Sequence, residues 1–187
     1  MSQGKAALRV GITCGDLNGI GLEVVLRTFE DARMLQDITP VLYASVRTLG
    51  HHRKAVGADE VPVHGIADAS EAAPRKLNVV NIWEEDVPVE FGKPSGESAK
   101  YAIKSLEAAT QDIAAGKVDV LVTAPIDKHA MQAAGFEHTG HTEYLKHVAN
   151  VEEVLMVLMD LDGHLRVGTV TGHIPLGSVP MEVTQER

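Results

Sequence analysis

The sequence is organised around the stretch VDVLVTAPIDKHAMQAAGFEHTGHTEYL, residues 118–145. Residues 118–123 are rich in β-branched side chains and lead to Pro125, which is typical of a buried strand that has to stop pairing. A polar segment, residues 127–129, follows directly. In α/β proteins, a strand that ends abruptly and continues into a polar loop places reactive groups at the carboxyl edge of the sheet. The stretch therefore predicts an α/β fold with its functional site at this edge.

The rest of the chain shows the hydrophobic patterns of alternating strands and helices. Further strands are expected at residues 8–14, 40–45, 61–64 and 77–83, and helices at 22–31, 49–56, between Ser95 and Gly116, and at 128–134. His51 and His52 lie in a basic helical segment and are expected to be solvated. Two apolar runs, 154–159 and 165–171, are separated by a short link with two Asp residues and a Gly, which favours a β-hairpin. We therefore expect a mixed sheet rather than a purely parallel one.

Length and hydrophobicity indicate a globular protein of modest size. The 187 residues allow one domain, or one domain with part of another. Hydrophobic residues make up 44% and charged residues 23% of the chain, which is ordinary for a globular protein. The amino-terminal segment lacks the apolar core of a signal peptide, and no run is apolar enough to cross a bilayer. We therefore expect a cytoplasmic protein without a membrane partner.

Charge and cysteine content narrow the candidate ligands. The formal net charge is -9, and Lys and Arg form no cluster, which argues against a nucleic-acid partner. Cys14 is the single cysteine, so an internal disulfide and a Cys-based zinc motif are excluded. A metal site would have to use His and carboxylate side chains.

Three glycines occur within the short segment Gly15-Asp-Leu-Asn-Gly-Ile-Gly21, here called the glycine loop. Such a loop lets the backbone turn sharply or approach a ligand closely, and N–H groups at the start of the following helix suit an anion. The spacing is neither the GxGxxG of dinucleotide-binding folds nor the GxxxxGK of P-loops. The glycine loop can therefore be either a structural turn or a ligand-binding loop. Accordingly, the Asp16 side chain either accepts hydrogen bonds from its own backbone or faces a cleft.

Four segments together resemble the motifs of one known family. They are, in chain order, Gly15-Asp-Leu-Asn-Gly-Ile-Gly21, Val122-Thr-Ala-Pro-Ile-Asp-Lys128, Thr139-Gly-His-Thr-Glu143 and Thr171-Gly-His-Ile-Pro-Leu176. The family they resemble is the 4-hydroxythreonine-4-phosphate dehydrogenases of vitamin B6 biosynthesis. Its members are considerably longer. The resemblance implies the amino-terminal part of a two-lobed dehydrogenase, with a lobe boundary near residues 120–140 and the carboxyl-terminal part absent.

The resemblance also implies a fold and a reaction. The fold is the α/β/α architecture of the isocitrate and isopropylmalate dehydrogenases, incomplete here, in which two lobes surround a cleft in a homodimer. The reaction is the NAD-dependent oxidation, with decarboxylation, of the small phosphorylated hydroxy acid 4-hydroxythreonine 4-phosphate on the route to pyridoxal phosphate. A divalent metal ion (zinc, magnesium or cobalt) is implied as the second cofactor.

Site residues follow from the resemblance position by position. His141 and Thr142 look like substrate contacts, and His173 looks like the first of three metal-binding histidines. Lys128 and Asp16 are weaker candidates for the same cleft. Each residue also has a structural alternative: Thr142 suits a helix N-terminus, His173 a loop that bonds backbone before a proline turn, and Lys128 a solvated helix start. Catalytic and NAD-binding residues stay unassigned, because the resemblance places most of them, and the other metal ligands, outside this chain.

Two departures from the family and three rival functions accompany this interpretation. Leu17 stands where the family usually has Pro, and Asp127 where it usually has Asn, which adds negative charge near a site for an anionic substrate.

A dehydrogenase of threonate or erythronate phosphate would show the same motifs. A chain with one of three metal ligands can also be a catalytically incomplete binding or dimerisation fragment, and we expect these residues alone to be inactive. An unrelated α/β enzyme with a phosphate at the glycine loop is the remaining alternative.

Overall fold

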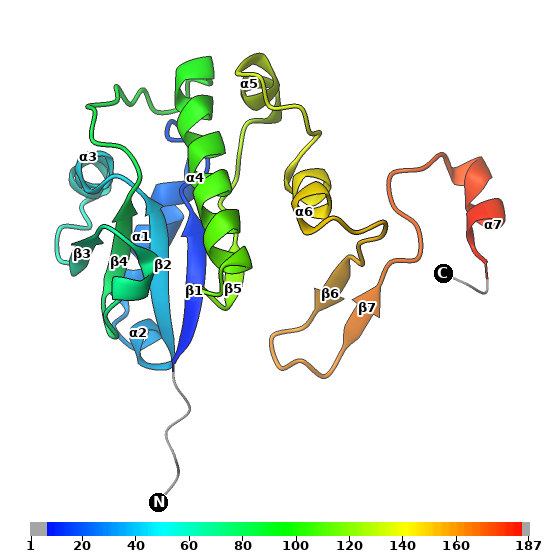
Figure 1. The fold of residues 1–187 in the computed structure, drawn as a ribbon, viewed down its shortest axis with the longest axis horizontal. Helices are drawn as coiled ribbons and strands as arrows, with labels where there is room; N and C mark the ends of the chain where they lie inside the picture. The colour runs from blue at the N-terminus through cyan, green and yellow to red at the C-terminus, as the bar shows by residue number, and fades with distance from the viewer. Residues whose placement is uncertain (1–6, 185–187) are drawn as a thin grey trace, which may run out of the picture. The chain divides into compact units, whose positions relative to one another are not determined.

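The computed structural model describes residues 7–184 of the chain. These residues divide into two compact units, with the division between His141 and Thr142. The first unit contains the strands β1 (Leu8–Thr13), β2 (Ile38–Ala44), β3 (Val63–Ile66), β4 (Leu77–Asn81) and β5 (Val120–Val122). They form one sheet in the order β3-β4-β2-β1-β5, and every neighbouring pair is parallel (Figure 1). All five overlap the predicted strands, whereas the predicted lobe boundary near residues 120–140 stays a prediction.

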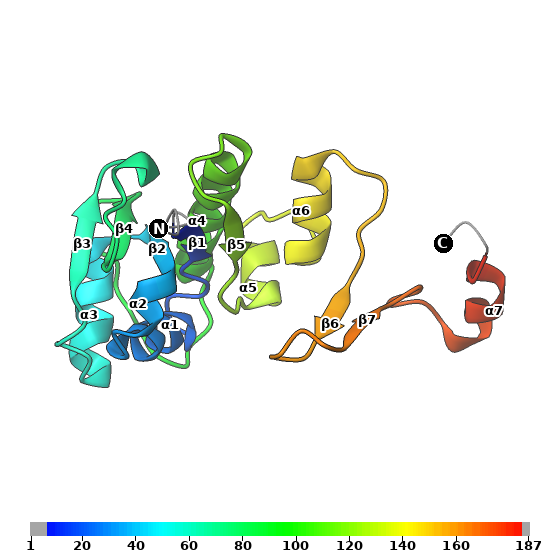
Figure 2. The ribbon, with the colours of Figure 1, turned by 90° about the horizontal axis from the view of Figure 1, so that it is seen from below.

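Helices cover both faces of this sheet. They are α1 (Gly21–Glu30), α2 (Met34–Asp37), α3 (Val46–Val56), α4 (Gly96–Ala114) and α5 (Lys128–Ala133), with a 3-10 turn at Ala69–Glu71. Figure 2 shows α4 on one side of the sheet and α1 and α3 on the opposite side. Successive residues of β2 point to opposite sides: Leu42 packs in one core with Leu22 of α1, and Val41 packs in the other with Ala109 of α4. The sheet is therefore buried on both faces at β2, as is usual for a parallel sheet.

Helix α4 shows why local sequence signals predicted this part of the fold. Its buried face repeats every three or four residues, as in Ala102, Leu106 and Ala109. The Ser95 hydroxyl caps its amino end by accepting a hydrogen bond from the Ser98 N–H at 3.1 Å. The helix that covers one face of the sheet is thus set by its own sequence.

The second unit contains most of helix α6 (His141–Ala149), the strands β6 (Val157–Met159) and β7 (Arg166–Gly168), a 3-10 turn at Leu176–Ser178, and helix α7 (Val179–Glu182). β6 and β7 pair antiparallel, which confirms the predicted hairpin. They form a sheet of their own, however, so the expected mixed sheet is wrong and the five-stranded sheet is purely parallel. A short link lets two strands pair with each other on one edge without a third strand, so a local hairpin signal does not require a larger sheet.

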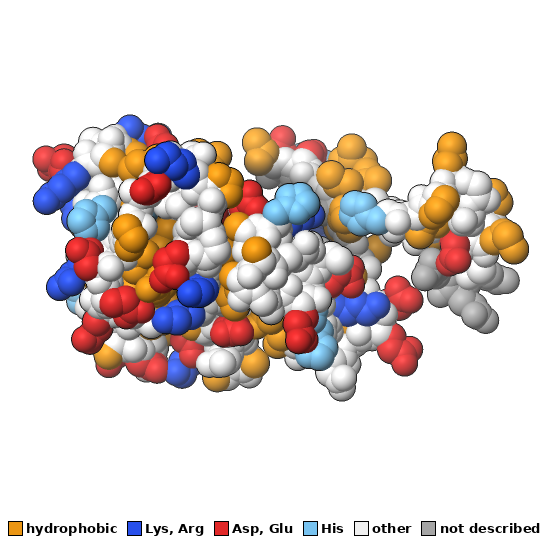
Figure 3. Space-filling model, turned by 90° about the horizontal axis from the view of Figure 1, so that it is seen from above, with side chains coloured by type: hydrophobic (Ala, Val, Ile, Leu, Met, Phe, Trp, Pro, Cys, Tyr) orange, Lys and Arg blue, Asp and Glu red, His pale blue; other side chains and the backbone are white. Residues whose placement is uncertain are grey.

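The second unit has little core of its own. Every described residue from 145 to 184 is at least partly exposed. Large apolar side chains are among these residues, including Leu155, Leu158 and Leu165 of the hairpin region, and Figure 3 shows others around α7. A two-stranded hairpin is marginally stable alone, and exposed apolar surface of this extent is typical of an interaction site. None of the helices within residues 7–184 is long and apolar enough to span a membrane.

Candidate functional site

The loops after β1 and β5 meet at the carboxyl edge of the sheet. The Asp16 N–H donates a hydrogen bond to the Pro125 carbonyl at 3.0 Å. Gly15 has a φ of +67°, and a Cβ at this position would lie 2.3 Å from the Pro125 oxygen. A glycine is therefore required at Gly15 both for its backbone conformation and for the close approach of the second loop.

Asp16 uses its side chain within the glycine loop. One carboxylate oxygen accepts hydrogen bonds from the Asn18 N–H at 3.1 Å and from the Ser98 hydroxyl at 2.8 Å. This is the Asx-type turn that the sequence left open as the structural alternative. Asp16 thereby joins the glycine loop to the start of α4.

Asn18 is a structural residue that the sequence analysis did not single out. It is buried, and its side-chain amide donates a hydrogen bond to the Lys93 carbonyl at 2.8 Å and accepts one from the Glu90 N–H at 2.9 Å. The Gly92 N–H also donates to the Asn18 carbonyl at 2.8 Å. The loop before α4 is therefore fastened to the glycine loop through a single residue.

His52 corrects another expectation, because it is fully buried rather than solvated. Its Nε2 lies 2.8 Å from the Leu17 carbonyl oxygen, and its Nδ1 lies 3.0 Å from that of Thr48. His51, its neighbour in the chain, is exposed as expected. The face of α3 that contains His52, Thr48 and Leu49 is turned toward the core. The basic residues of the segment had suggested an exposed helix, so the burial of this face was not predicted. Leu17, in place of the usual proline, is itself buried.

Lys128 and His141 lie close together in the first unit. A Cβ at Gly140 would lie 3.5 Å from Cε and 3.8 Å from Nζ of Lys128, so the lysine side chain runs beside the residue that precedes His141. Burial lowers the pKa of the half-buried His141 ring, and the positive charge of Lys128 lowers that pKa further. The carboxylate of Asp127 accepts a hydrogen bond from the Ala130 N–H at 2.7 Å and so caps α5. The negative charge of Asp127 therefore stabilises the N-terminus of α5.

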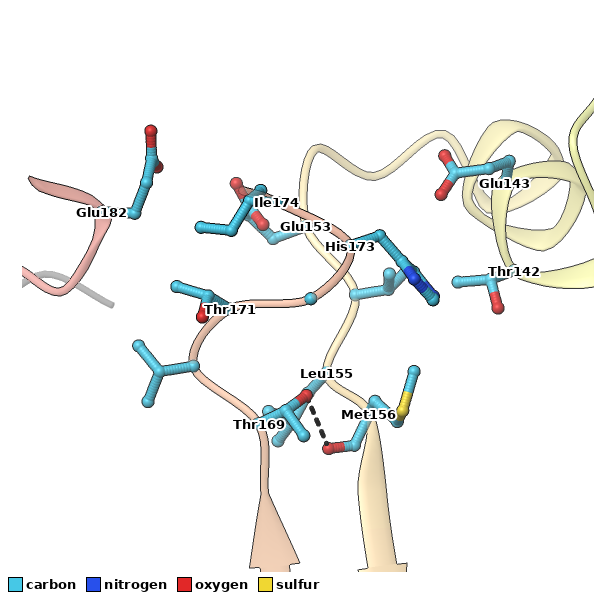
Figure 4. Close-up of a pocket in the computed structure, with 13 residues that line it drawn as sticks. Thr142, Glu143, Glu153, Leu155, Met156, Thr169, Thr171, His173, Ile174 and Glu182 are labelled. Atoms are coloured by element: carbon cyan, nitrogen blue, oxygen red, sulfur yellow. Dashed lines mark hydrogen bonds between the residues drawn. The ribbon is translucent and has the colours of Figure 1, made fainter. Parts of the chain in front are cut away.

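A second group of predicted residues lines a cavity in the second unit. The cavity has a volume of about 380 Å³, and its lining includes Thr142 and Glu143 of α6, Glu153, and the loop around His173 that follows β7. Figure 4 shows the His173 ring extending from this loop on the side of Thr142. His173 is exposed and has a φ of +57°, which is uncommon for a residue with a side chain. His141 and His173 belong to different units, so the cleft that the resemblance implies for both residues stays a prediction.

The described residues do not complete a metal site. In the part of the chain that the structure describes, no group of three or more His, Cys, Asp or Glu residues is placed to hold a metal ion. About three protein ligands are needed for a catalytic zinc, and the resemblance assigns only His173 in this chain. The remaining ligands would have to come from outside residues 7–184.

The loops after β1 and β5 meet at the carboxyl edge of a parallel sheet, which defines an open α/β fold of the class whose ligand sites, where present, lie at this edge. Within that class, a family model described as "Pyridoxal phosphate biosynthetic protein PdxA" matches residues 36–187. The chain belongs to this PdxA family, which confirms the resemblance, and three of the four motifs lie within the matched residues.

Curated relatives named as dehydrogenases match this chain over about half of their own length. The 4-hydroxythreonine-4-phosphate dehydrogenase of Bacteroides thetaiotaomicron is 43% identical over 180 residues, which cover 96% of the chain and 49% of that protein. That of Sulfurihydrogenibium sp. is 34% identical over 180 residues, covering 96% and 54%. A protein of Bradyrhizobium diazoefficiens, provisionally described as a D-threonate 4-phosphate dehydrogenase, is 30% identical over 181 residues, covering 95% and 51%. The chain thus spans about half the length of the curated relatives it matches.

Solved structures confirm the α/β fold. The crystal structure of a 4-hydroxythreonine-4-phosphate dehydrogenase from Burkholderia phymatum has a TM-score of 0.80 at 32% identity and covers 91% of this chain and 52% of that one. The enzyme of the same name from Klebsiella pneumoniae has a TM-score of 0.84 at 24% identity, covering 98% and 56%. At that identity the second comparison shows the fold alone.

Proposed function

We propose that this chain forms part of an NAD-dependent dehydrogenase that oxidises 4-hydroxythreonine 4-phosphate during cytoplasmic pyridoxal phosphate biosynthesis. The secondary alcohol gives a hydride to NAD⁺, which becomes NADH, and a proton to solvent. The resulting β-keto acid then loses its carboxylate as carbon dioxide, and the carbon that carried the carboxylate takes up a proton from solvent. The observation that carries this proposal is the PdxA family match over residues 36–187, together with 43% identity to the Bacteroides dehydrogenase.

His141 and Thr142 are proposed to bind the substrate. Burial and Lys128 lower the pKa of His141, which favours the neutral ring, and a neutral imidazole can donate one hydrogen bond and accept another. Thr142 is exposed in the first turn of α6, where free backbone N–H groups and the positive end of the helix dipole favour an anion. These properties suit a phosphorylated hydroxy acid.

Lys128 is proposed to add positive charge beside this substrate, since it is exposed and runs beside Gly140. Asp16 is a weaker candidate, because its carboxylate already accepts hydrogen bonds from Asn18 and Ser98. A phosphate selects cations and N–H donors over carboxylates. The substrate proposal therefore rests on Lys128, His141 and Thr142.

NAD and a divalent metal ion are proposed as cofactors of the whole enzyme, with His173 as the one metal ligand in this chain. Because residues 7–184 contain no complete metal site, we propose that the 187-residue chain alone is inactive and binds divalent metal weakly. Calorimetry measures this directly. Tight, stoichiometric zinc binding by this chain would contradict it.

A homodimer is proposed as the assembly. The exposed apolar side chains of the hairpin region, such as Leu155 at 71% and Leu158 at 60% exposure, support association. Size-exclusion chromatography with light scattering measures the mass, and a well-behaved monomer at micromolar concentration would contradict association.

A second candidate substrate is threonate 4-phosphate or the related erythronate 4-phosphate. The Bradyrhizobium relative, whose provisional description names D-threonate 4-phosphate, favours this alternative. Both candidates are phosphorylated hydroxy acids, so the interactions proposed for His141 and Thr142 apply to either.

The proposed function is tested first by binding and then by turnover. NMR signals of the His141 ring are followed while the chain is titrated with each phosphorylated acid and, as the control, with inorganic phosphate. A shift that occurs with 4-hydroxythreonine 4-phosphate and weakens in Thr142→Val supports the substrate role. The chain is then paired with the part of the Bacteroides relative outside the matched residues, and NADH formation is measured with each acid and NAD⁺. NADH from threonate phosphate alone would favour the alternative, and no NADH from any acid would end the dehydrogenase proposal.

A further inference from the structure

Asn18 differs from the other asparagines of the chain because a glycine follows it. The chain contains four asparagines, and the other three, Asn78, Asn81 and Asn150, precede valine or isoleucine. Deamidation of an asparagine begins when the backbone nitrogen of the next residue attacks the side-chain amide carbon. A β-branched side chain hinders this attack, whereas glycine places no Cβ in its way. The sequence therefore contains one position at which spontaneous deamidation is chemically easy.

The fold holds both reacting groups of this position in hydrogen bonds. The Gly19 N–H, whose nitrogen would have to attack, donates to the Asp16 carbonyl at 3.0 Å. The Asn18 side-chain amide is 5% exposed, donates to the Lys93 carbonyl at 2.8 Å and accepts from the Glu90 N–H at 2.9 Å. Attack requires the Gly19 nitrogen to lose its proton and the amide carbon to turn toward it. Both sets of hydrogen bonds must therefore break first.

Water is available next to this contact. Asn18, Gly19, Phe91 and Gly92 contribute to the lining of a surface hollow of about 510 Å³. Hydrogen bonding, rather than distance from solvent, therefore keeps the side-chain amide of Asn18 intact.

The partners of the Asn18 amide belong to a segment that can open locally. They lie in residues 84–95, here called the 84–95 loop, which contains no helix or strand and is mostly exposed. Segments with few buried contacts open at a lower free energy than the sheet and helices around them. The 84–95 loop can therefore leave Asn18 while the rest of the first unit stays folded.

We propose that Asn18 is a deamidation site that the bound 84–95 loop protects and that reacts when this loop opens. The Gly19 nitrogen loses its proton and forms a bond to the Asn18 side-chain carbon, and ammonia leaves from the amide. Water then opens the cyclic imide to aspartate or isoaspartate at position 18. The reaction needs water and base alone. This inference does not rest on the dehydrogenase reaction.

The product should not restore the original contact. A carboxylate at position 18 has no N–H to donate, and it would meet the Lys93 carbonyl oxygen, a second acceptor, where the amide now donates. Asp16, whose carboxylate accepts from the Asn18 N–H at 3.1 Å, already places a negative charge in the same loop. Deamidation should therefore be a one-way step that leaves the 84–95 loop detached from the glycine loop.

Peptide mapping by mass spectrometry measures the reaction. The 187-residue chain is kept at mildly alkaline pH, either folded or unfolded in guanidinium chloride, and the deamidated fraction of the peptide that contains Asn18 is followed with time. The unfolded chain should react more than about tenfold faster, because the rate in the folded chain is scaled by the small fraction of open molecules. Equal rates in the two states, or no reaction at Asn18 in the unfolded chain, would overturn the proposal.

Two glycine variants distinguish local opening from global unfolding. Gly92 of the 84–95 loop has a φ of +74° and Gly57, after α3, a φ of +67°, and at both positions a Cβ would meet nothing within 4 Å. Alanine is therefore strained to a similar extent at each. Gly92→Ala should speed deamidation of the folded chain about fivefold, whereas Gly57→Ala should leave the rate unchanged. Equal acceleration would show that Asn18 reacts through global unfolding and would refute protection by the loop.

Asn18→Asp tests the consequence of the reaction. The Gly92 N–H donates to the backbone carbonyl of Asn18 at 2.8 Å, so its hydrogen exchange reports on the bound loop and not on the altered side chain. Exchange at Gly92 should be about fivefold faster or more in Asn18→Asp, while the amide of Leu106 within α4 should be unchanged. An unchanged rate at Gly92 would show that the loop accepts the product and would overturn the one-way step.

Discussion

Replacing Ser105 by alanine should destabilise the first unit far more than replacing Ser45. Ser105 is a fully buried residue of α4 whose hydroxyl donates a hydrogen bond to the Tyr43 carbonyl at 2.6 Å and accepts one from the Cys14 N–H at 2.9 Å. Both backbone groups belong to residues with no exposure. The hydroxyl thus bridges the ends of β1 and β2 where the glycine loop begins.

The magnitude follows from the two groups that lose their partner. A buried polar group left unsatisfied costs about 1–3 kcal/mol, so Ser105→Ala should lower the free energy of unfolding by about 2–4 kcal/mol. Ser45 is equally buried, but its hydroxyl has no hydrogen-bond partner among the described residues. Ser45→Ala removes a buried polar group without stranding another, so it should change the unfolding free energy by only about 0 to 1 kcal/mol, in the stabilising direction.

Urea denaturation followed by tryptophan fluorescence measures both variants. Trp83 is the single tryptophan and is buried in the first unit, where its indole N–H donates to the Thr48 hydroxyl at 3.1 Å. With a slope of about 2 kcal/mol per molar urea, the midpoint for Ser105→Ala should fall by about 1–2 M. Equal midpoints for the two variants, or a loss below about 0.5 kcal/mol for Ser105→Ala, would refute the bridging role.

Three further predictions concern Gly15, Cys14 and His141. Gly15→Ala should cost clearly more than Gly57→Ala in the urea assay, because both glycines have a φ of +67° but only the first would place a Cβ against backbone; the control should lose about 1 kcal/mol, and equal losses would count against the close approach. Burial raises the pKa of the Cys14 thiol to about 12, so mass spectrometry should find it unmodified by iodoacetamide at about pH 8.5 until urea unfolds the chain, and rapid labelling of native protein would disprove its burial. In an NMR titration the pKa of His141 should lie below its ordinary value of about 6.5 and should rise in Lys128→Met but not in Lys128→Arg. Because the pKa of His141 is lower in the folded than in the unfolded chain, His141 reduces the free energy of unfolding only as the pH falls below about 6.5 and has no effect above it. An unchanged pKa in Lys128→Met would contradict the influence of the lysine charge.

The elements of the first unit could be predicted because their signals are local. The apolar run of β2, the capped amphipathic pattern of α4, and the β-branched run at β5 each lie within one segment. The assembly of strands into separate sheets is not local. The hairpin of β6 and β7 was predicted from its short link, but nothing in that link states whether a third strand joins it, and the mixed sheet was therefore a wrong extrapolation.

Residues of the candidate site could be predicted only where they belong to a sequence motif of the family. His141, Thr142 and His173 came from the family resemblance, whereas Asn18 was quoted only as part of the glycine loop and His52 lies in no motif. Their roles depend on hydrogen bonds to residues distant in the chain, such as Lys93 for Asn18 and Leu17 for His52. A single polar residue in a loop or on a helix does not reveal such a partner, so these two structural contacts needed three-dimensional information.

The position of β1 between β2 and β5 has a consequence for the nascent chain. The Arg9 N–H is held by the Asp119 carboxylate, and the two residues are 110 positions apart. At translation rates of about 5–20 residues per second, β1 waits about 5–20 s on the ribosome with β2 as its only neighbour. Throughout this interval the apolar sheet is incomplete, and its exposed strand edge makes the nascent chain prone to aggregation.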